Sequence, residues 1–172
     1  MELMDVMLKR RSTRKFNDED ITKEELDKIL HSALLAPTSR NRKPCNFMVI
    51  ERKETLELLS KSKDHGADLL RGANKAIAVV ADTMIADTWI EDSSIALTYM
   101  HLMATELGLG SCWVQIHLRS RDGVDSQEIV RDILKIDDHY KIVGVLALGH
   151  SDDIPEAHSI EDVDKGKIHF LV

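Results

Sequence analysis

A short segment near the start of the chain concentrates cations and hydroxyl groups in a sequence that is acidic as a whole. Residues 10–16 read RRSTRKF, with four cations and two hydroxyl groups in seven residues, whereas the formal net charge of the chain is −7. Arginine guanidinium groups pair bidentately with phosphate oxygens, and hydroxyl groups can complete such a cradle. The segment therefore either binds a phosphorylated ligand or is a solvated basic stretch at a helix end, where the helix dipole also favours cations.

A second polar segment, residues 36–47, reads APTSRNRKPCNF and joins a predicted helix to a predicted strand. Two prolines stiffen it, and most of its side chains can form hydrogen bonds. Taken alone, it is either an ordinary connecting loop or a binding loop positioned by the elements on both sides.

The sequence patterns of nucleophilic and metal-dependent enzymes do not occur in this chain. It contains no G-x-S-x-G turn, no G-x-x-x-x-G-K-[ST] phosphate loop and no H-E-x-x-H metal motif. Residues 108–110 (GLG) lack the third glycine of a dinucleotide fingerprint and follow a helix rather than a strand. The eight histidines are scattered, and Cys45 and Cys112 form no C-x-x-C pair. We therefore predict no catalytic side chain, no metal site and no disulfide.

The totals favour one small domain, residues 1–172, that works in the cytoplasm. A chain of 172 residues with 43% hydrophobic and 31% charged residues is typical of a single globular domain. The negative net charge argues against nucleic acid as the main partner, because phosphate backbones favour a basic surface. No segment approaches the roughly 20 apolar residues of a membrane span, and the first ten residues do not have the pattern of a signal peptide. We expect neither a nucleic-acid nor a membrane partner.

Hydrophobic periodicity and capping residues predict interleaved helices and strands. Helices are expected over residues 3–9, 22–35, 53–61, 89–107 and 125–134, and strands over residues 46–51, 76–81, 111–118 and 142–148. Capping boxes are expected at Thr22 with Glu25, Thr88 with Glu91, and Asp125 with Glu128. The helix over residues 89–107 is apolar around much of its circumference, so it needs cover on more than one side, for which a subunit interface is a reasonable source. The order of elements predicts an α/β or α+β fold with one central sheet.

Four segments, in this order along the chain, resemble the FMN-dependent nitroreductase family. They are RRSTRKF at 10–16, APTSRNRKPCNF at 36–47, ELGLGSCWVQ at 106–115 and VGVLALGHSD at 143–152. Each motif is weak by itself, but the family has similar motifs in the same order, and their spacing is collinear over nearly the whole chain. The chain is therefore identified as a short, single-domain member of this family.

The resemblance implies an α+β fold of three layers, α/β/α-like, with a central mixed sheet covered by helices. It also implies a homodimer with FMN at the subunit interface, in which the C-terminal strand predicted at residues 167–171 is exchanged with the partner subunit. The residues expected to bind the cofactor are Arg10, Arg11, Ser12, Arg14, Pro37, Thr38, Ser39, Asn41, Lys43, Trp113, Val114, Gln115, Gly149 and His150.

By the same resemblance, the segment around Arg10 and Ser12 holds the phosphate and ribityl chain, and Arg14 lies near the pyrimidine end of the flavin. Residues 37–43 reach that flavin from the other subunit, and residues 113–115 offer backbone donors towards flavin N5. The sequence departs from the family at three places. Lys43 replaces the usual glutamine and Cys45 replaces the usual tryptophan. The cation that many members carry after the last strand is missing from PEAH at 155–158, with Lys165 or Lys167 as candidate replacements.

The implied activity is electron transfer from NADH or NADPH to nitro compounds, quinones or similar acceptors by a ping-pong flavin mechanism. Alternatives on the same fold are a flavin enzyme of different chemistry, such as reductive dehalogenation or flavin fragmentation, and a non-catalytic FMN-binding or sensor protein. A relic of the fold without flavin is a further alternative, because the usual C-terminal cation is missing.

Overall fold

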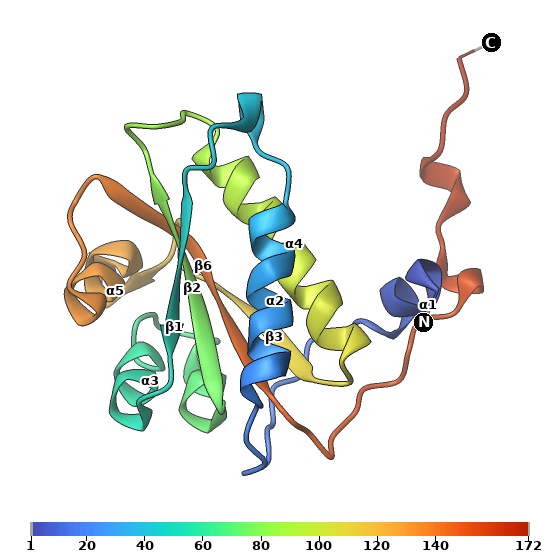
Figure 1. Cartoon of the computed structure of the whole chain (residues 1–172), viewed down its shortest axis with the longest axis horizontal. Helices are drawn as coiled ribbons and strands as arrows, with labels where there is room; N and C mark the ends of the chain where they lie inside the picture. Colours follow the sequence, from blue (N-terminus) through green and yellow to red (C-terminus); the bar gives the residue numbers. More distant parts are fainter. Residues whose placement is uncertain (1, 172) are drawn as a thin grey trace.

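A four-stranded antiparallel sheet forms the centre of the computed structural model, which describes residues 2–171 (Figure 1). The strand order is β1-β2-β6-β3. The strand bounds are Cys45–Ile50 for β1, Lys75–Asp82 for β2, Gly110–Gln115 for β3 and Tyr140–Gly149 for β6. The two central strands, β2 and β6, are buried along nearly their whole length. Burial on both faces explains the continuous apolar runs that predicted these strands.

Helices cover both faces of the sheet, with α2 and α4 on one face and α3 and α5 on the other (Figure 1). Their bounds are Lys23–Leu35 for α2, Lys53–Leu59 for α3, Trp89–Glu106 for α4 and Ser126–Leu134 for α5. Successive side chains of a strand point to opposite faces. Ile77 and Val79 of β2 therefore pack beneath α2 and α4, whereas Ala78 and Val80 pack beneath α3 and α5. The expected three-layer α+β fold is confirmed.

The remaining elements are short, and all five predicted helices are present within residues 2–171. The short elements are α1 (Leu3–Lys9), η1 (Ser39–Asn41), η2 (Asp68–Gly72), β4 (Ser120–Arg121), β5 (Val124–Asp125), η3 (Ile160–Asp162) and η4 (Lys165–Lys167). Across the described range, no helix combines the length and the apolar character needed to cross a bilayer.

The sheet differs from the expectation in two respects. Its four strands pair antiparallel throughout, so the expected mixed character is limited to one isolated parallel bridge between Ser12 and Ser111. The third predicted strand ends at Gln115 rather than at residue 118, because the next two N–H groups both donate to the same carbonyl of β6. Leu118 then turns into the left-handed region with a φ of 56°.

The three predicted capping boxes have different outcomes. Thr22 and Glu25 form the reciprocal box at the start of α2, with hydrogen bonds of 3.2 and 2.8 Å. Asp125 caps α5 by accepting from the N–H two residues further on at 2.8 Å, without the reciprocal bond. The box predicted at Thr88 does not form, because the Thr88 hydroxyl donates instead to the Asp92 carboxylate at 3.1 Å.

The C-terminal tail leaves the sheet after β6 and runs past α1 (Figure 1). The His158 N–H donates to the Leu8 carbonyl at 2.9 Å, which holds the tail against the end of α1. Residues 167–171 form no strand within the described chain, and Phe170 is 83% exposed. Pairing of this segment with the sheet of a partner stays a prediction.

The residue that ends α5 offers a test of the helix termination. Lys135 adopts the left-handed conformation, with φ 58° and ψ 49°, where glycine is preferred. Replacing Lys135 with glycine removes the clash of the Cβ atom with the backbone, which stabilises the folded state. Glycine also increases the entropy of the unfolded chain, which offsets part of this effect. We therefore expect the free energy of unfolding to rise by about 0.5–1 kcal/mol. Urea denaturation of Lys135→Gly and Lys135→Ala would measure it. Equal stability of the two variants would contradict the argument.

Candidate functional site

The cationic segment at residues 10–14 lies alongside the edge strand β3. The Thr13 N–H donates to the Ser111 carbonyl at 2.9 Å, and the Asn17 N–H donates to the His150 carbonyl at 2.9 Å. These two bonds attach the segment to the start of β3 and to the end of β6. The fold thus brings together three predicted parts of the site that are far apart in the sequence, at residues 10–14, 113–115 and 149–150.

Alternate residues of this segment face different surroundings. Burial raises the pKa of the Cys112 thiol on β3, and four neighbours act against that shift, in order of size Arg14, Ser12, Lys63 and Arg10. Arg10, Ser12 and Arg14 therefore lie near Cys112 of β3. Arg10 is half-buried and Arg14 is exposed, so they leave cationic surface open to a ligand.

Arg11 and Thr13 face a separate cavity of about 530 Å³ between the end of α4, the glycine-rich turn at 108–110 and the first part of the tail. The Arg11 guanidinium donates to the Glu156 carbonyl, so the tail at 155–157 closes one side of this cavity. The proposed replacement cations do not line it. Lys165 and Lys167 lie in η4, and the Lys167 ammonium pairs with Asp164 at 3.7 Å.

The strand β3 keeps backbone groups available on its outer side. The Ser111 carbonyl accepts from Thr13, and the Gln115 carbonyl accepts from the Lys63 ammonium at 3.0 Å, both outside the pairing with β6. Because alternate residues of a strand direct their N–H and C=O groups to the same side, the backbone of Trp113 also faces outwards. The N–H groups of Trp113 and Gln115 are therefore placed as donors along the open edge.

The side chains of this stretch are occupied by contacts within the protein. The Trp113 indole N–H donates to Gln115 Oε1 at 2.9 Å, and the Gln115 amide donates to the His117 carbonyl at 3.0 Å. A Cβ at Gly144 would lie 2.5 Å from the indole nitrogen, so only glycine allows this packing. Val114 is buried in the core. What Trp113, Val114 and Gln115 can offer a ligand is therefore mainly their backbone.

Lys63 is a candidate that the sequence interpretation missed. Its side chain is buried, with 9% exposed, and burial is the main cause that lowers the pKa of its ammonium, followed by the nearby charge of Arg119. The ammonium holds the Gln115 carbonyl and acts on Cys112. No motif marks Lys63, because it lies in an ordinary polar stretch, KSKDHG, and only the packing of that stretch against β3 gives it a role.

A buried pair connects α4 to the same edge. His101 Nδ1 and the Ser111 hydroxyl are 2.7 Å apart, and both residues are buried. Burial, with a further contribution from Arg10, lowers the pKa of His101 to about 4. The neutral imidazole thus fixes Ser111, whose carbonyl in turn holds Thr13.

Gly149 and His150 lie where the cationic segment meets the end of β6. A Cβ at Gly149 would come within 2.8 Å of the Phe16 ring, so glycine permits the close approach of the two segments. His150 Nε2 lies 3.9 Å from the Glu19 carboxylate. Both residues therefore adjoin the segment that carries the cations.

The second polar loop lies at the other end of α4. The Ser39 N–H donates to the Asp92 carboxylate at 2.9 Å in the first turn of this helix, whereas the cationic segment adjoins its C-terminal half through His101. Asp92 and His101 are nine residues apart, which is about 14 Å along the helix at 1.5 Å per residue. Within one chain, the predicted loop residues Pro37, Thr38, Ser39, Asn41 and Lys43 are therefore not brought together with the other predicted site residues.

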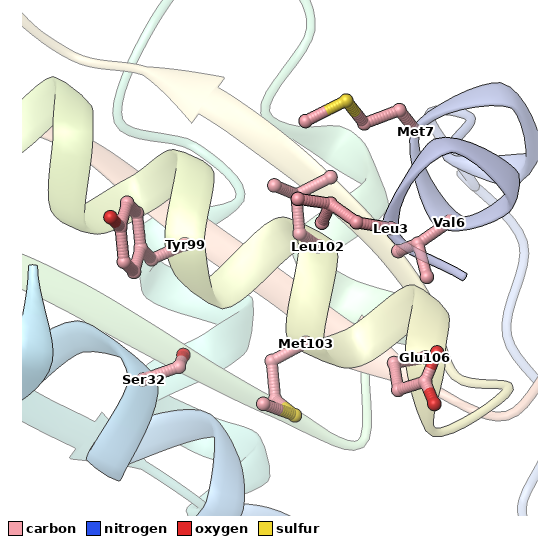
Figure 2. Close-up of a pocket in the computed structure, with 8 residues that line it drawn as sticks. All are labelled: Leu3, Val6, Met7, Ser32, Tyr99, Leu102, Met103 and Glu106. Atoms are coloured by element: carbon pink, nitrogen blue, oxygen red, sulfur yellow. The ribbon is translucent and has the colours of Figure 1, made fainter. Parts of the chain in front are cut away.

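An apolar groove of about 430 Å³ lies between α1, α2 and α4 (Figure 2). Its lining is Leu3, Val6 and Met7 from α1, Ser32 from α2, and Tyr99, Leu102, Met103 and Glu106 from α4. Figure 2 shows Leu102 and Met103 of α4 on the side towards α1 and α2. Leu3 is 63% exposed and Tyr99 is 40% exposed. This face is the uncovered side of α4 for which the sequence predicted a subunit interface.

Cations along an open sheet edge, next to outward backbone donors, are the kind of groups that hold phosphorylated cofactors. The model of the nitroreductase family matches residues 7–150. An FMN-dependent nitroreductase from Clostridium difficile superposes with a TM-score of 0.95 at 41% identity, over 97% of this chain and 98% of that one. A nitroreductase family protein from Clostridium difficile 630 superposes with a TM-score of 0.78 at 32% identity, over 91% of this chain and 88% of that one.

A further relative comes from Archaeoglobus fulgidus and has the provisional name NADH dehydrogenase/NAD(P)H nitroreductase. It is 31% identical over 165 residues, which are 94% of this chain and 92% of the relative. The chain belongs to the nitroreductase family, and the expected class of enzyme, an oxidoreductase, is confirmed.

The buried His101 gives a pH-dependent contribution to stability. Its pKa is about 4 in the folded state, against an ordinary value of 6.5. The unfolded chain therefore binds the proton more readily between these values, so the contribution is complete above pH 6.5 and is lost as the pH falls towards 4. We expect a loss of roughly 3 kcal/mol over this window.

The measurement is the difference in the free energy of unfolding between the protein and His101→Asn, which keeps an oxygen near Ser111 but does not titrate. That difference should fall as the pH decreases from 6.5 to 4. Parallel curves for the two proteins would show that His101 is not the titrating group.

Proposed function

We propose that this chain is an FMN-dependent oxidoreductase that transfers electrons from NADH or NADPH to nitro compounds, quinones or similar small acceptors. The observation that carries the proposal is the docking of the Arg10–Arg14 segment along the open edge of β3, through the Thr13–Ser111 hydrogen bond of 2.9 Å. It places phosphate-binding groups and outward backbone donors next to each other. The printed name of the structural relative with 41% identity, an FMN-dependent nitroreductase, supports the same cofactor.

The residues present fit FMN. Arg10 and Ser12, with Arg11 at the adjoining cavity, would hold the phosphate and ribityl chain, because guanidinium and hydroxyl groups are the donors that phosphate oxygens accept. Gly149 and His150 adjoin the same end. The backbone donors of the Trp113–Gln115 stretch would face the ring system, with the position of Gln115 fixed by the buried Lys63.

When bound, FMN would supply the two-electron redox chemistry that links the nicotinamide donor to the acceptor in a ping-pong reaction. The protein contributes orientation and charge. Arg14 would lie near the pyrimidine end of the flavin, where its cation stabilises the negative charge that reduction adds. Such a reaction requires no side-chain nucleophile.

We further propose a homodimer with a composite site and a single FMN-binding domain per chain. The apolar groove on α1 and α4 would be covered by a second copy, whose loop at 37–43 would complete the site next to the cationic segment. Two features support this arrangement. The loop and the segment lie at opposite ends of α4 within one chain, and the groove exposes large apolar side chains.

The open edge of β1 is the proposed acceptor for the exchanged C-terminal strand. In the sheet of the described chain, β1 pairs with β2 alone. A cavity of about 300 Å³ adjoins its free edge, between residues 48–52 and the Ile133–Leu134 end of α5. An added strand would pair the free backbone groups of β1 and bury apolar side chains such as Ile168 and Phe170.

The first test is the visible spectrum of the purified protein, followed by anaerobic addition of NADH or NADPH. A flavin spectrum that bleaches on addition supports the proposal. A flavin that does not bleach would favour a binding or sensor role, and a protein that takes up no added FMN would contradict the proposed function.

Arg14 offers a test of redox tuning. Replacing Arg14 with methionine removes the cation near the flavin, so reduced FMN loses stabilisation and the midpoint potential should fall. For a two-electron couple, a fall of roughly 30 mV corresponds to about 1.4 kcal/mol. The matched control is Lys15→Met, because the Lys15 ammonium is exposed and pairs with Asp153 at 3.2 Å. Potentials that are equal in the two variants would argue against the placement of Arg14.

The tail offers a test of the exchanged strand. Deleting residues 165–172 should weaken the dimer and release FMN, because β1 of the partner loses its added strand. Light scattering and the absorbance of retained flavin measure the two effects, with full-length Lys165→Ala as the control. A truncated protein that is still a yellow dimer would refute the exchange.

A further inference from the structure

The loop at residues 38–43 has an unusual backbone. Arg40, Asn41 and Lys43 all adopt positive φ angles, of 53°, 55° and 50°. Side chains other than glycine rarely occupy this region, because the Cβ atom approaches the backbone, and asparagine tolerates it best. Such clusters of strained residues persist where the surrounding structure fixes them, and they occur often at ligand sites. The sequence places long polar side chains at positions that glycine would fill without strain.

One buried carboxylate fixes the start of this loop. Asp92 of α4 is 2% exposed, and one of its oxygens accepts the Ser39 N–H at 2.9 Å while the other accepts the Thr88 hydroxyl at 3.1 Å. No cation pairs with it among residues 2–171 at ion-pair distance. A buried charge is unfavourable unless hydrogen bonds satisfy it, so these two bonds are its compensation.

A second contact closes the loop. The Thr38 hydroxyl accepts the Lys43 N–H at 3.0 Å, and the Asn41 N–H donates to the Thr38 carbonyl at 3.0 Å. The loop is therefore held internally by Thr38, and it is attached to the rest of the fold by Asp92 and by the Arg42 guanidinium, which donates to the Ile85 carbonyl at 3.0 Å. The side chains of Asn41 and Lys43 are exposed. The hydrogen bonds of the loop therefore hold polar side chains at the surface and do not pack apolar ones.

We propose that Asp92 is a positioning residue that acts across the dimer: it fixes the loop of its own chain as one half of the FMN site of the partner subunit. The inference rests on the proposed function, because it requires FMN in a composite site. In this proposal the buried carboxylate and the positive φ angles of the loop have one role, which is to hold the loop in the conformation that binds FMN. It also predicts that a substitution at Asp92 weakens FMN binding at the site beside Arg10 of the partner subunit, and not at the site beside Arg10 of its own chain.

The first comparison uses three variants of the full-length protein. Asp92→Leu removes both acceptors, Asp92→Asn keeps an amide oxygen for the Ser39 N–H, and Glu91→Leu removes an exposed carboxylate from the same helical turn. We expect the dissociation constant of FMN to rise at least tenfold for Asp92→Leu and to change less than threefold for the other two. Circular dichroism and light scattering establish that each variant is folded and dimeric.

The decisive measurement is complementation between subunits. Asp92→Leu and a double variant, Arg10→Ala with Ser12→Ala, are co-expressed with different affinity tags, and the mixed dimer is isolated. One of its two sites combines an intact cationic segment with an intact loop, and the other carries both defects. We expect one FMN per mixed dimer and almost none in either parent dimer. A mixed dimer that stays empty would overturn the proposal, because Asp92 would then act only within its own chain.

A second pair of variants tests the same contact if Asp92→Leu does not fold. Ser39→Pro removes the N–H that Asp92 accepts, at the first position of a helical turn that tolerates proline. Ser39→Ala is its matched control, because it also lacks the hydroxyl group but keeps the N–H. Two results together support the proposal. Ser39→Pro binds FMN more weakly than Ser39→Ala, and its mixed dimer with the Arg10→Ala, Ser12→Ala double variant again binds FMN at one site. Equal binding in the two variants overturns it. Failure of the unchanged protein to bind FMN would instead contradict the proposed function.

Discussion

The hydrogen bond between Thr13 and Ser111 attaches the cationic segment to the sheet, and the candidate site depends on this attachment. An edge strand normally presents a row of free backbone groups that other chains can pair with. Here the outer side of β3 is used at Ser111 by the segment and at Gln115 by Lys63. The groups that remain between these two points are open to a ligand near the cationic segment. A cofactor that carries both phosphate and a hydrogen-bonding ring system suits such an edge.

The helix α4 relates this edge to the rest of the molecule. Most of its buried side chains are apolar and pack on the sheet, but three buried residues are polar, and two of these contact the polar loop at 37–43 or the anchor of the cationic segment on β3. His101 holds Ser111 in its C-terminal half, and Asp92 holds Ser39 in its first turn. One rigid element therefore positions both polar segments, while its outer surface lines the apolar groove. The same helix therefore links the groove, which a second copy would cover, to the site, which that copy would complete.

Much of the fold could be predicted from the sequence because the signals are local. The apolar runs of β2 and β6 follow from burial on both faces, and the capping box at Thr22 marks the start of α2. Two expectations failed because other contacts competed with the predicted ones. The Thr88 hydroxyl bonds to Asp92 instead of capping the helix, and β3 stops early because its continuation shares one acceptor on β6. The sheet is antiparallel rather than mixed because β2 and β3, which run in the same direction, are not neighbours: β6 lies between them and runs the opposite way.

The sequence by itself determined the family, most of the helices and strands, and the two polar segments, because residue type and spacing along the chain encode these features. Only the tertiary structure decided which groups lie together. It showed that Trp113 and Gln115 satisfy each other's side chains and leave their backbone outwards. It also revealed Lys63 at the edge, and it placed the loop at 37–43 beside the first turn of α4, away from the cationic segment near its C-terminal half. Such relations depend on contacts between residues far apart in the chain, which periodicity and local composition do not record.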